Sequence, residues 1–419
     1  MSLGKSISRR RFLALTATST VACSALSRRS AAAAVRADAV VRVGVIGCGV
    51  RGTQLMGALA KRKGVQVAAV CDVFDPRKRE ARALSGAEVC PRWQDMVERQ
   101  EVDAVVIATP DHWHAPIAVA AMECGKDVYC EPPMALHIEE AKVFRACAAR
   151  TGRIVQIGAE QTSEGQWHAA RDTLRAGRIG NPLWSQGSYS RQDRFARSAS
   201  AAANPTPFDL DWAAFHGENR HRPFDPDRYA RWWAYWDYSG GVATGVFYSK
   251  LAALLLALGP AFPRRVSAAG GVYACDGREV PDSFVMTCQY PAGHTVVLAS
   301  AMAMAAGRPA IIRGEKASLE FLGDRLCLTP ESGSVSGVRA WRGRRDVEFI
   351  CAEERPKHLD DWLDGIRTRR RCVCDEELGF RTMVAIAMAV QAYRESQTLY
   401  YDEKTEQVGV SPSRSVPVC

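Results

Sequence analysis

Apolar residues come in short runs along residues 41–157, and segments with helical spacing lie between the runs. Val41–Ile46 and Val65–Cys71 are almost wholly apolar and largely β-branched, as expected for strands buried on both faces of a parallel sheet. Similar runs predict strands at 103–108, 127–130 and 154–157, and helical spacing predicts helices at 53–63, 76–84, 93–98, 115–124 and 138–150. Strands that alternate with helices predict a doubly wound parallel sheet.

The rest of the chain has a different pattern. Helical spacing at 166–176 and 251–258 is followed by short runs without helices between them, which predicts a mainly antiparallel sheet. These strands are predicted at 266–273, 283–290, 295–302, 310–313, 318–321 and 325–328, and closing helices at 357–369 and 376–395. An apolar outer face of such a sheet would need a partner, so we expect a homo-oligomer formed through this sheet. The chain therefore divides into a leader with its linker at 1–37, a first domain at 38–158 and a second domain at 159–419.

A glycine motif joins the first predicted strand to the first predicted helix. The first glycine permits a tight turn, the second lets a pyrophosphate approach the backbone, and the third lets helix and strand pack closely. The second strand ends in Asp72, which can accept hydrogen bonds from ribose hydroxyls. The order of strand, glycines, helix, strand and acid predicts a Rossmann dinucleotide site made by Gly47, Cys48, Gly49, Val50, Arg51, Gly52 and Asp72. Asp72 favours NAD because a 2′-phosphate would meet a carboxylate, and Arg77 keeps NADP open as the less favoured cofactor.

Two further strand ends carry candidate residues, because ligands of doubly wound sheets bind at the carboxyl ends of the strands. These ends read Thr109-Pro110-Asp111-His112-Trp113-His114 and Glu131-Pro132-Pro133. From them we assign Thr109, Pro110, His114, Glu131 and Pro132 to the cofactor site. Asp111, His112 and His114 are of metal-ligating types, but a clear third and fourth ligand are missing, so we predict no metal.

The composition changes this picture only at the N-terminus. The chain has 419 residues, 47% hydrophobic and 24% charged, which is typical of a globular protein. No apolar run reaches the roughly 20 residues of a membrane-spanning helix. Residues 1–34 hold six basic residues and no acid, whereas the remainder holds 49 basic and 46 acidic residues. The net charge of +9 therefore gives no reason to expect a nucleic-acid partner.

The basic leader has the features of an export signal. It reads Ser8-Arg9-Arg10-Arg11-Phe12-Leu13, followed by a weakly apolar stretch at 14–26 and an Ala run at 31–34. The Arg pair before Phe-Leu resembles the twin-arginine signal, which predicts a periplasmic or other extracytoplasmic location. An untranslocated basic tail is the alternative. Twin-arginine export moves folded proteins, and none of the 14 cysteines forms a CxxC set, so we expect mostly free thiols.

The strand ends also resemble a known family. Thr109–His114, followed by Gly125-Lys126-Asp127-Val128-Tyr129-Cys130-Glu131-x-Pro133, is similar to the Gfo/Idh/MocA oxidoreductases, which include glucose–fructose oxidoreductase and inositol dehydrogenase. The resemblance extends to 225–232, 236–241 and 358–369, and the exported subgroup with twin-arginine leaders looks closest. It implies a Rossmann domain followed by a C-terminal α/β domain with a large open sheet. It also implies hydride transfer between NAD(P) and a sugar or cyclitol carbon.

The chain departs from this family at the acid–base positions. The resemblance implies a Lys in Glu-Lys-Pro, and an Asp and a His four residues apart, whereas this chain has Pro132, Gly245 and Ser249 there. Pro and Gly offer no proton-transfer group, and an unaided Ser is a poor base. Lys250 and His114 are the weak substitutes that the sequence offers.

An irregular, aromatic-rich stretch at 191–240 supplies the candidate substrate residues. Long loops in compact proteins are often functional, and Tyr, Trp and Arg suit sugar rings and their hydroxyls. The candidates are Arg228, Tyr229, Trp233, Tyr235 and Trp236. Packing of the loop or a subunit interface explains the same residues equally well.

Three functions stay open on these grounds. The first is a non-catalytic NAD-binding homologue with a sugar-like ligand. The second is an active NAD-dependent sugar dehydrogenase that uses other residues. The third is an NAD-dependent glycoside hydrolase, an activity known in the wider family.

Overall fold

The structure is a computed structural model that describes residues 40–190, 205–217, 222–304, 307–323, 325–331 and 347–412. The predicted leader at 1–37 lies outside the described residues. The chain divides into two compact units. Unit 1 holds Met1–Gly158, Arg197–Ser239 and Leu359–Phe380, and unit 2 holds Ala159–Ala196, Gly240–His358 and Arg381–Cys419. Every statement below concerns their described residues.

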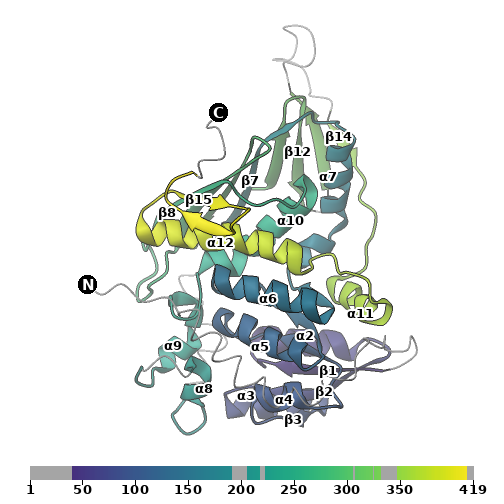
Figure 1. The fold of residues 1–419 in the computed structure, drawn as a ribbon, viewed down its shortest axis with the longest axis vertical. Coiled ribbons are helices and arrows are strands. Elements are labelled where there is room, and N and C mark those ends of the chain that lie inside the picture. The colour runs from purple at the N-terminus through teal and green to yellow at the C-terminus, as the bar shows by residue number, and fades with distance from the viewer. Residues whose placement is uncertain are drawn as a thin grey trace. The chain divides into compact units, whose positions relative to one another are not determined.

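Unit 1 is built on the predicted parallel sheet (Figure 1). Its strand order is β3-β2-β1-β4-β5-β6, so the order reverses between β1 and β4, where ligands of such sheets bind. The strands are β1 (Val41–Ile46), β2 (Val65–Cys71), β3 (Glu88–Val89), β4 (Ala104–Ile107), β5 (Asp127–Cys130) and β6 (Val155–Ile157). The helices that connect them are α2 (Val50–Ala60), α3 (Asp75–Ser85), α4 (Trp93–Glu98), α5 (Asp111–Glu123) and α6 (Ile138–Thr151). The Rossmann prediction is confirmed.

Unit 2 is built on a mixed sheet whose strand pairs are antiparallel, except that β7 and β10 run parallel. The strand order is β14-β13-β12-β11-β7-β10-β9-β8-β15-β16. The strands are β7 (Pro182–Ser190), β8 (Arg265–Gly271), β9 (Ser283–Tyr290), β10 (His294–Ala301), β11 (Ala310–Gly314), β12 (Ala317–Leu322), β13 (Arg325–Pro330), β14 (Glu348–Ile350), β15 (Leu399–Asp402) and β16 (Gln407–Gly409). The large, mainly antiparallel sheet is therefore confirmed, although the sequence patterns missed β7, β14, β15 and β16.

Short and long helices accompany this sheet. They are η1 (Glu160–Ser163), α7 (Gly165–Arg175), the π-helical turn η4 (Ala243–Phe247), α10 (Tyr248–Leu258) and α12 (Glu376–Glu395), whose first residues belong to unit 1. Helices α7 and α10 contact each other, and α10 also contacts β7 (Figure 1). Along β10 the residues alternate between buried and half-buried, so one face of the sheet is buried and the other is open.

Two segments of the predicted second domain belong to unit 1 instead. Helix α11 (His358–Thr368) places Trp362 and Ile366 in the same hydrophobic core as Val43 and Leu55. The segment at 205–239 carries α8 (Trp212–His216), α9 (Pro226–Ala230) and η3 (Trp232–Ala234), and it pairs Leu210 with Phe74 in an isolated β-bridge. The first segment of unit 1 ends at Gly158, and burial of apolar faces returns the chain twice to unit 1.

The state of the cysteines and the search for membrane-spanning helices both concern the described residues. The cysteines among the described residues are free thiols, and burial raises the pKa of several of them, that of Cys71 to about 12. In the part of the chain that the structure describes, no helix combines the length and apolarity needed to cross a membrane.

Candidate functional site

The loop between β1 and α2 requires glycine at two positions. Gly47 has a φ of +89°, and a Cβ atom on it would lie 2.5 Å from the carbonyl oxygen of Ala108. A Cβ atom on Gly52 would lie 1.9 Å from the carbonyl oxygen of Gly47. At Gly49 the nearest atom would instead be Nη1 of Arg77, the end of a flexible side chain, at 3.3 Å. The backbone is therefore held in a tight turn by Gly47 and Gly52, and over Gly49 it has only a movable side chain nearby.

The N-terminus of α2 follows this loop without a side-chain cap. Gly49 is the N-cap residue and supplies no side-chain hydrogen bond, so the helix end is not capped by its own N-cap residue. Aligned N–H groups and the helix dipole make such an end attractive to phosphate. The hydroxyl of Thr109, at the end of β4, is also buried and has no hydrogen-bond partner among the described residues. These are features of a site for a polar, anionic ligand.

Asp72 is buried at the end of β2, and both of its carboxylate oxygens accept backbone hydrogen bonds. Oδ2 accepts from the N–H of Cys48 at 2.6 Å, and Oδ1 accepts from the N–H of Phe74 at 2.9 Å. The carboxylate thus joins the glycine loop to the segment that follows β2. Each carboxylate oxygen has a second lone pair, so Asp72 retains the capacity to accept ribose hydroxyls.

The loops after β4 and β5 are connected by His114 and by an ion pair. His114 is buried in the first turn of α5, with Nδ1 2.6 Å from the carbonyl oxygen of Pro133 and Nε2 2.8 Å from that of Thr109. Arg51 donates from Nε to Glu131 at 2.8 Å. Because backbone carbonyls engage both ring nitrogens, the geometry gives His114 a positioning role and argues against the proton-transfer role considered from the sequence. Pro132, which precedes Pro133 through a cis peptide bond, brings no side-chain donor to this loop.

His112 points to a different partner from His114. Its Nε2 lies 2.9 Å from the carbonyl oxygen of Phe215, which also accepts from Nε1 of Trp113 at 2.9 Å. Across the described ranges, no group of three or more His, Cys, Asp or Glu residues is arranged to hold a metal ion.

The aromatic segment at 205–239 packs against the residues that follow Asp72. The N–H of Asp75 donates to the carbonyl of Asp209, and the N–H of Asp211 donates to the carbonyl of Val73, both at 2.9 Å. Tyr229 is buried, with its ring centroid 5.6 Å from that of Phe74. Phe74 therefore anchors this segment beside Asp72. No local sequence pattern marks Phe74 as part of this site.

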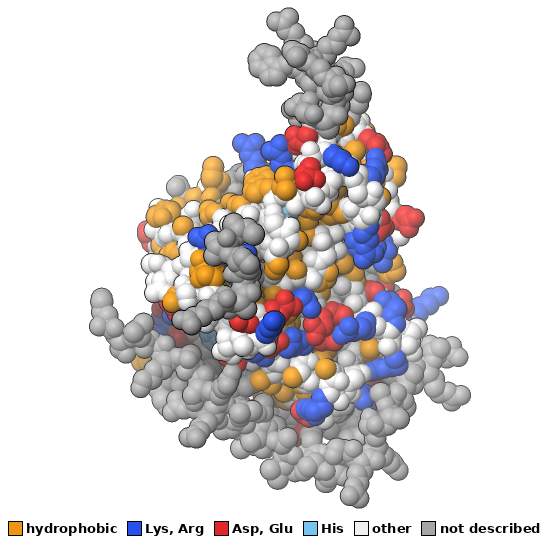
Figure 2. Space-filling model, turned by 45° about the horizontal axis from the view of Figure 1, so that its top comes forward, with side chains coloured by type: hydrophobic (Ala, Val, Ile, Leu, Met, Phe, Trp, Pro, Cys, Tyr) orange, Lys and Arg blue, Asp and Glu red, His pale blue; other side chains and the backbone are white. Residues whose placement is uncertain are grey.

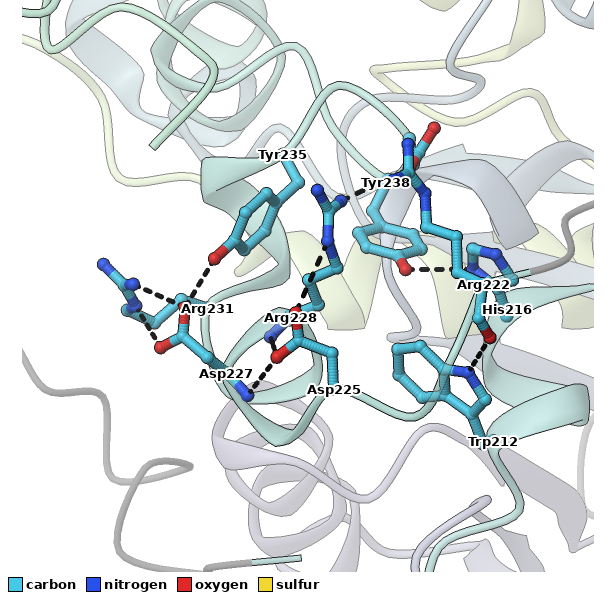
Figure 3. Close-up of polar contacts among 10 residues, drawn as sticks. Trp212, His216, Arg222, Asp225, Asp227, Arg228, Arg231, Tyr235 and Tyr238 are labelled. Atoms are coloured by element: carbon cyan, nitrogen blue, oxygen red, sulfur yellow. Dashed lines mark hydrogen bonds and ion pairs between the residues drawn. The ribbon is translucent and has the colours of Figure 1, made fainter. Parts of the chain in front are cut away.

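Three of the predicted substrate residues, Arg228, Tyr229 and Tyr235, make contacts with other side chains of unit 1, and Figure 3 shows those of Arg228 and Tyr235. Arg228 lies 4.1 Å from the ring of Tyr235 and pairs with Asp237 at 3.3 Å. The hydroxyl of Tyr235 donates to the carboxylate of Asp227, and burial raises the pKa of Tyr235 to about 12. Tyr229 is buried as described above. Trp233 and Trp236 are half-buried, as is Arg228.

Arg77 lies between the aromatic segment and the glycine loop. Its guanidinium carbon is 5.2 Å from the ring centroid of Tyr229 and 6.0 Å from that of Phe74. Its Nη1 approaches Gly49, as noted above. A cation held at this place can meet phosphate groups that enter the loop.

The remaining candidates lie in unit 2. Gly245 is exposed, its φ is not positive, and a Cβ atom on it would meet no atom within 4 Å. Ser249 and Lys250 are half-buried on α10. Burial lowers the pKa of Lys250, an effect that the charge of Glu164 opposes.

Comparison with known proteins settles the family. Residues 41–159 match the GFO_IDH_MocA model, described as an oxidoreductase family with an NAD-binding Rossmann fold. Residues 213–401 match the model of the C-terminal alpha/beta domain of the same family. The chain belongs to the Gfo/Idh/MocA oxidoreductase family. NAD is accordingly the cofactor of its Rossmann domain, and the glycine loop, the open end of α2 and Asp72 fit the pyrophosphate and adenosine of NAD.

Individual relatives of this Gfo/Idh/MocA protein match it over part of their length. Inositol 2-dehydrogenase 3 of Saccharopolyspora erythraea is 34% identical over 145 residues, which are 34% of this chain and 43% of that protein. A glycosyl hydrolase family 109 protein of Shewanella sp. (strain W3-18-1) is 30% identical over 166 residues, 37% of this chain and 36% of that protein. The chain thus spans less than half the length of these curated relatives.

Solved structures share the fold over most of the chain. The WlbA dehydrogenase from Bordetella pertussis, in complex with NADH and UDP-GlcNAcA, has a TM-score of 0.67 at 18% identity, covering 87% of this chain and 99% of that one. A levoglucosan dehydrogenase in complex with NADH has a TM-score of 0.65 at 16% identity, covering 86% of this chain and 98% of that one. At these identities the likeness concerns the fold.

Proposed function

We propose that this Gfo/Idh/MocA protein binds NAD(H) and a sugar-like ligand but does not oxidise that ligand at ordinary enzymatic rates. The observation that carries the proposal is the joint presence of Pro132, Gly245 and Ser249 at the positions that the family resemblance assigns to the Lys, Asp and His. General acid–base catalysis is worth about 10²–10⁴-fold in rate, so a site without these groups keeps only what positioning supplies.

The substitutes that the sequence offered do not repair this loss. Both ring nitrogens of His114 face backbone carbonyls, which supports a role in joining two loops. Lys250 lines a pocket within unit 2, together with side chains of α7 and the sheet. Bound NAD would supply a hydride acceptor. The residues of this chain then hold the pyrophosphate at α2 and the adenosine ribose at Asp72, without a placed base for a substrate hydroxyl.

The test combines nucleotide binding with turnover. Calorimetry of the purified protein should show NAD binding, and a panel of sugars and cyclitols should give NAD reduction far below the ordinary range of about 1–10³ s⁻¹. The triple variant Pro132→Lys, Gly245→Asp, Ser249→His should raise that rate, whereas Pro132→Lys alone should do little because such groups act as a unit. Gly245→Asp fits sterically, since space is open around its Cβ position.

Two results would contradict the proposal. Wild-type turnover at ordinary rates would show that other residues carry the chemistry, and Lys250 and His114 would be mutated first. Hydrolysis of nitrophenyl glycosides that depends on added NAD would favour glycoside hydrolysis, an alternative suggested by the similarity to glycosyl hydrolase family 109 proteins.

We also propose that the protein self-associates through the open face of the unit 2 sheet. Val285 on β9 is exposed, and Val297 and Ala299 on β10 are half-buried on the same face. Figure 2 shows exposed hydrophobic side chains on unit 2. Light scattering should report an oligomer for the wild type and a smaller species for Val285→Lys with Val297→Lys. A monomeric wild type at micromolar concentration would refute this.

Export through the twin-arginine route remains a proposal supported by Arg9-Arg10-Arg11-Phe12-Leu13. Changing Arg9 and Arg10 to Lys should retain the protein in the cytoplasm, because the pathway recognises the paired arginines. Arg28→Lys with Arg29→Lys is the matched control within the same leader. Unchanged periplasmic accumulation of the first variant would remove the proposal.

A further inference from the structure

Unit 2 contains a pocket of about 210 Å³ whose polar groups point to a ligand class. Helices α7 and α10, strands β7, β11 and β12 and the turn η1 all contribute to its wall. The side chains that matter are Lys250, Arg308, Gln161, Gln166, Trp167 and Phe321. All of them belong to unit 2, so the pocket is defined without reference to unit 1.

Lys250 brings an unmatched cation to this pocket. A Cβ atom on Gly187 would lie 3.9 Å from Cδ of Lys250, so the lysine stem runs close to the β7 backbone. No described residue forms a hydrogen bond or ion pair with its ammonium group; burial lowers its pKa, and the more distant charge of Glu164 opposes this shift. An ammonium group that is partly removed from water and lacks a partner costs free energy unless a ligand supplies the partner.

Gln166 adds an unmatched acceptor. Its Nε2 donates to Glu164 at 2.9 Å, which fixes the orientation of the amide. Its Oε1 is buried and has no hydrogen-bond partner within the described part of the chain. The large majority of buried side-chain polar atoms in proteins have a hydrogen-bond partner, so an unpaired acceptor that lines a pocket offers a place for a donor such as a ligand hydroxyl.

The aromatic wall and the charged lining residues further restrict the chemical class of ligand that would fit the pocket. Trp167 stacks on Phe321 with ring centroids 3.9 Å apart, and its Nε1 is held by Glu164 at 3.3 Å. Both side chains are almost fully buried, so they present the pocket with a rigid apolar wall, against which C–H groups of a sugar can pack. The described lining residues include two cations, the half-buried Lys250 and the exposed Arg308, and no Asp or Glu; Glu164 lies outside the lining but acts on Lys250 through its charge. This lining favours a ligand with a negative charge over a neutral one.

We propose that this pocket binds a monosaccharide-sized sugar acid. The carboxylate pairs with Lys250 and Arg308, a hydroxyl donates to Oε1 of Gln166, and the ring lies against the Trp167–Phe321 stack. This deepens the proposed function by naming the ligand class, and it rests on that function only for the sugar-like nature of the ligand.

Calorimetry on the full chain without added nucleotide tests the proposal, with D-glucuronate, D-glucose and inorganic phosphate as probes. Glucuronate should bind, and glucose should bind at least about tenfold more weakly because it lacks the charge. Lys250→Met should lose at least about tenfold in glucuronate affinity, and Gln166→Glu should lose binding through charge repulsion. Lys404→Met, which removes an exposed lysine from the turn after β15, is the control and should bind like the wild type.

Several results would overturn the inference. They are equal binding of glucose and glucuronate, phosphate binding as tight as glucuronate binding, no glucuronate binding at millimolar concentration, or equal losses in Lys250→Met and Lys404→Met. Thermal melts check folding, and Lys250→Met should be no less stable than the wild type because it removes a partly desolvated charge. A separate NAD titration distinguishes the two proposals. NAD binding without glucuronate binding refutes the pocket, whereas the reverse refutes the nucleotide site.

Discussion

Removal of the Asp72 carboxylate should weaken NAD binding and destabilise unit 1 together. Asp72→Ala deletes the acceptors of two backbone N–H groups, those of Cys48 and Phe74. The first belongs to the glycine loop and the second to the residue that anchors the aromatic segment. The substitution therefore affects the two structures that border the adenosine side of the cofactor site.

The magnitudes follow from the two hydrogen bonds and from the ribose. Hydrogen bonds to a charged group contribute about 1.5–3 kcal/mol, so loss of the ribose contact should weaken NAD binding about 10- to 150-fold. Each buried N–H left without an acceptor costs about 1–3 kcal/mol, so the free energy of unfolding should fall by about 2–6 kcal/mol. Asp72→Asn keeps one acceptor oxygen, so its NAD affinity and its free energy of unfolding should both lie between those of Asp72→Ala and the wild type.

Calorimetric titration with NAD and NADP, beside urea unfolding followed by tryptophan fluorescence, measures both effects. The control is Asp75→Ala, which removes an exposed carboxylate paired with Lys78 at 2.8 Å only three residues further along the chain. NADP should gain relative to NAD in Asp72→Ala, because the carboxylate no longer repels the 2′-phosphate and Arg77 remains nearby. Adding Arg77→Met should cancel that gain.

The reasoning would be wrong if Asp72→Ala bound NAD like the wild type while remaining folded. It would also be wrong if Asp75→Ala lost as much NAD affinity as Asp72→Ala. A loss of stability without a loss of NAD affinity would assign Asp72 to structure alone.

Three further outcomes are expected. Gly52→Ala should abolish measurable NAD binding in calorimetry, because its Cβ atom would lie 1.9 Å from the Gly47 carbonyl oxygen; normal binding would refute the steric argument. Tyr229→Ala should cost about 3 kcal/mol or more in urea unfolding and expose the segment at 205–239 to proteolysis, since its ring packs on Phe74; an unchanged cleavage pattern would contradict this. Burial lowers the pKa of His168 and His294, so the stability they contribute is complete above about pH 6.5 and is lost as the pH falls from there towards the folded-state pKa. Urea unfolding at about pH 7.5 and about pH 5 should show a smaller loss for His294→Gln than for the wild type, and an equal loss would refute the linkage.

Local sequence patterns were sufficient to place many helices and strands of this protein. Helix α12 at Glu376–Glu395 and strands β1, β2, β5 and β9 have the predicted bounds, because the periodicity of apolar residues is a property of each segment alone. The glycine loop was equally readable, since positive φ and close backbone approach leave no alternative to glycine at Gly47 and Gly52. Short strands such as β3 and β16 were not predicted, because two or three residues are too few to show a periodic pattern of apolar residues.

Which surfaces these elements cover depends on long-range packing and could not be predicted from local patterns. The sequence around Tyr229 and Tyr235 was equally compatible with a sugar site and with a packed loop. In the structure Tyr229 packs on Phe74, which favours the packed loop. Helix α11 packs in the core of unit 1, although the residues that precede it, Gly240–His358, belong to unit 2. The sequence pointed to Lys250 as a candidate proton-transfer residue. Its pocket could not be predicted, because α7, β11 and β12, which supply lining residues, are distant from Lys250 in sequence. A local pattern shows that an apolar or charged face must be covered by a partner. It does not show which partner, because long-range packing sets that choice.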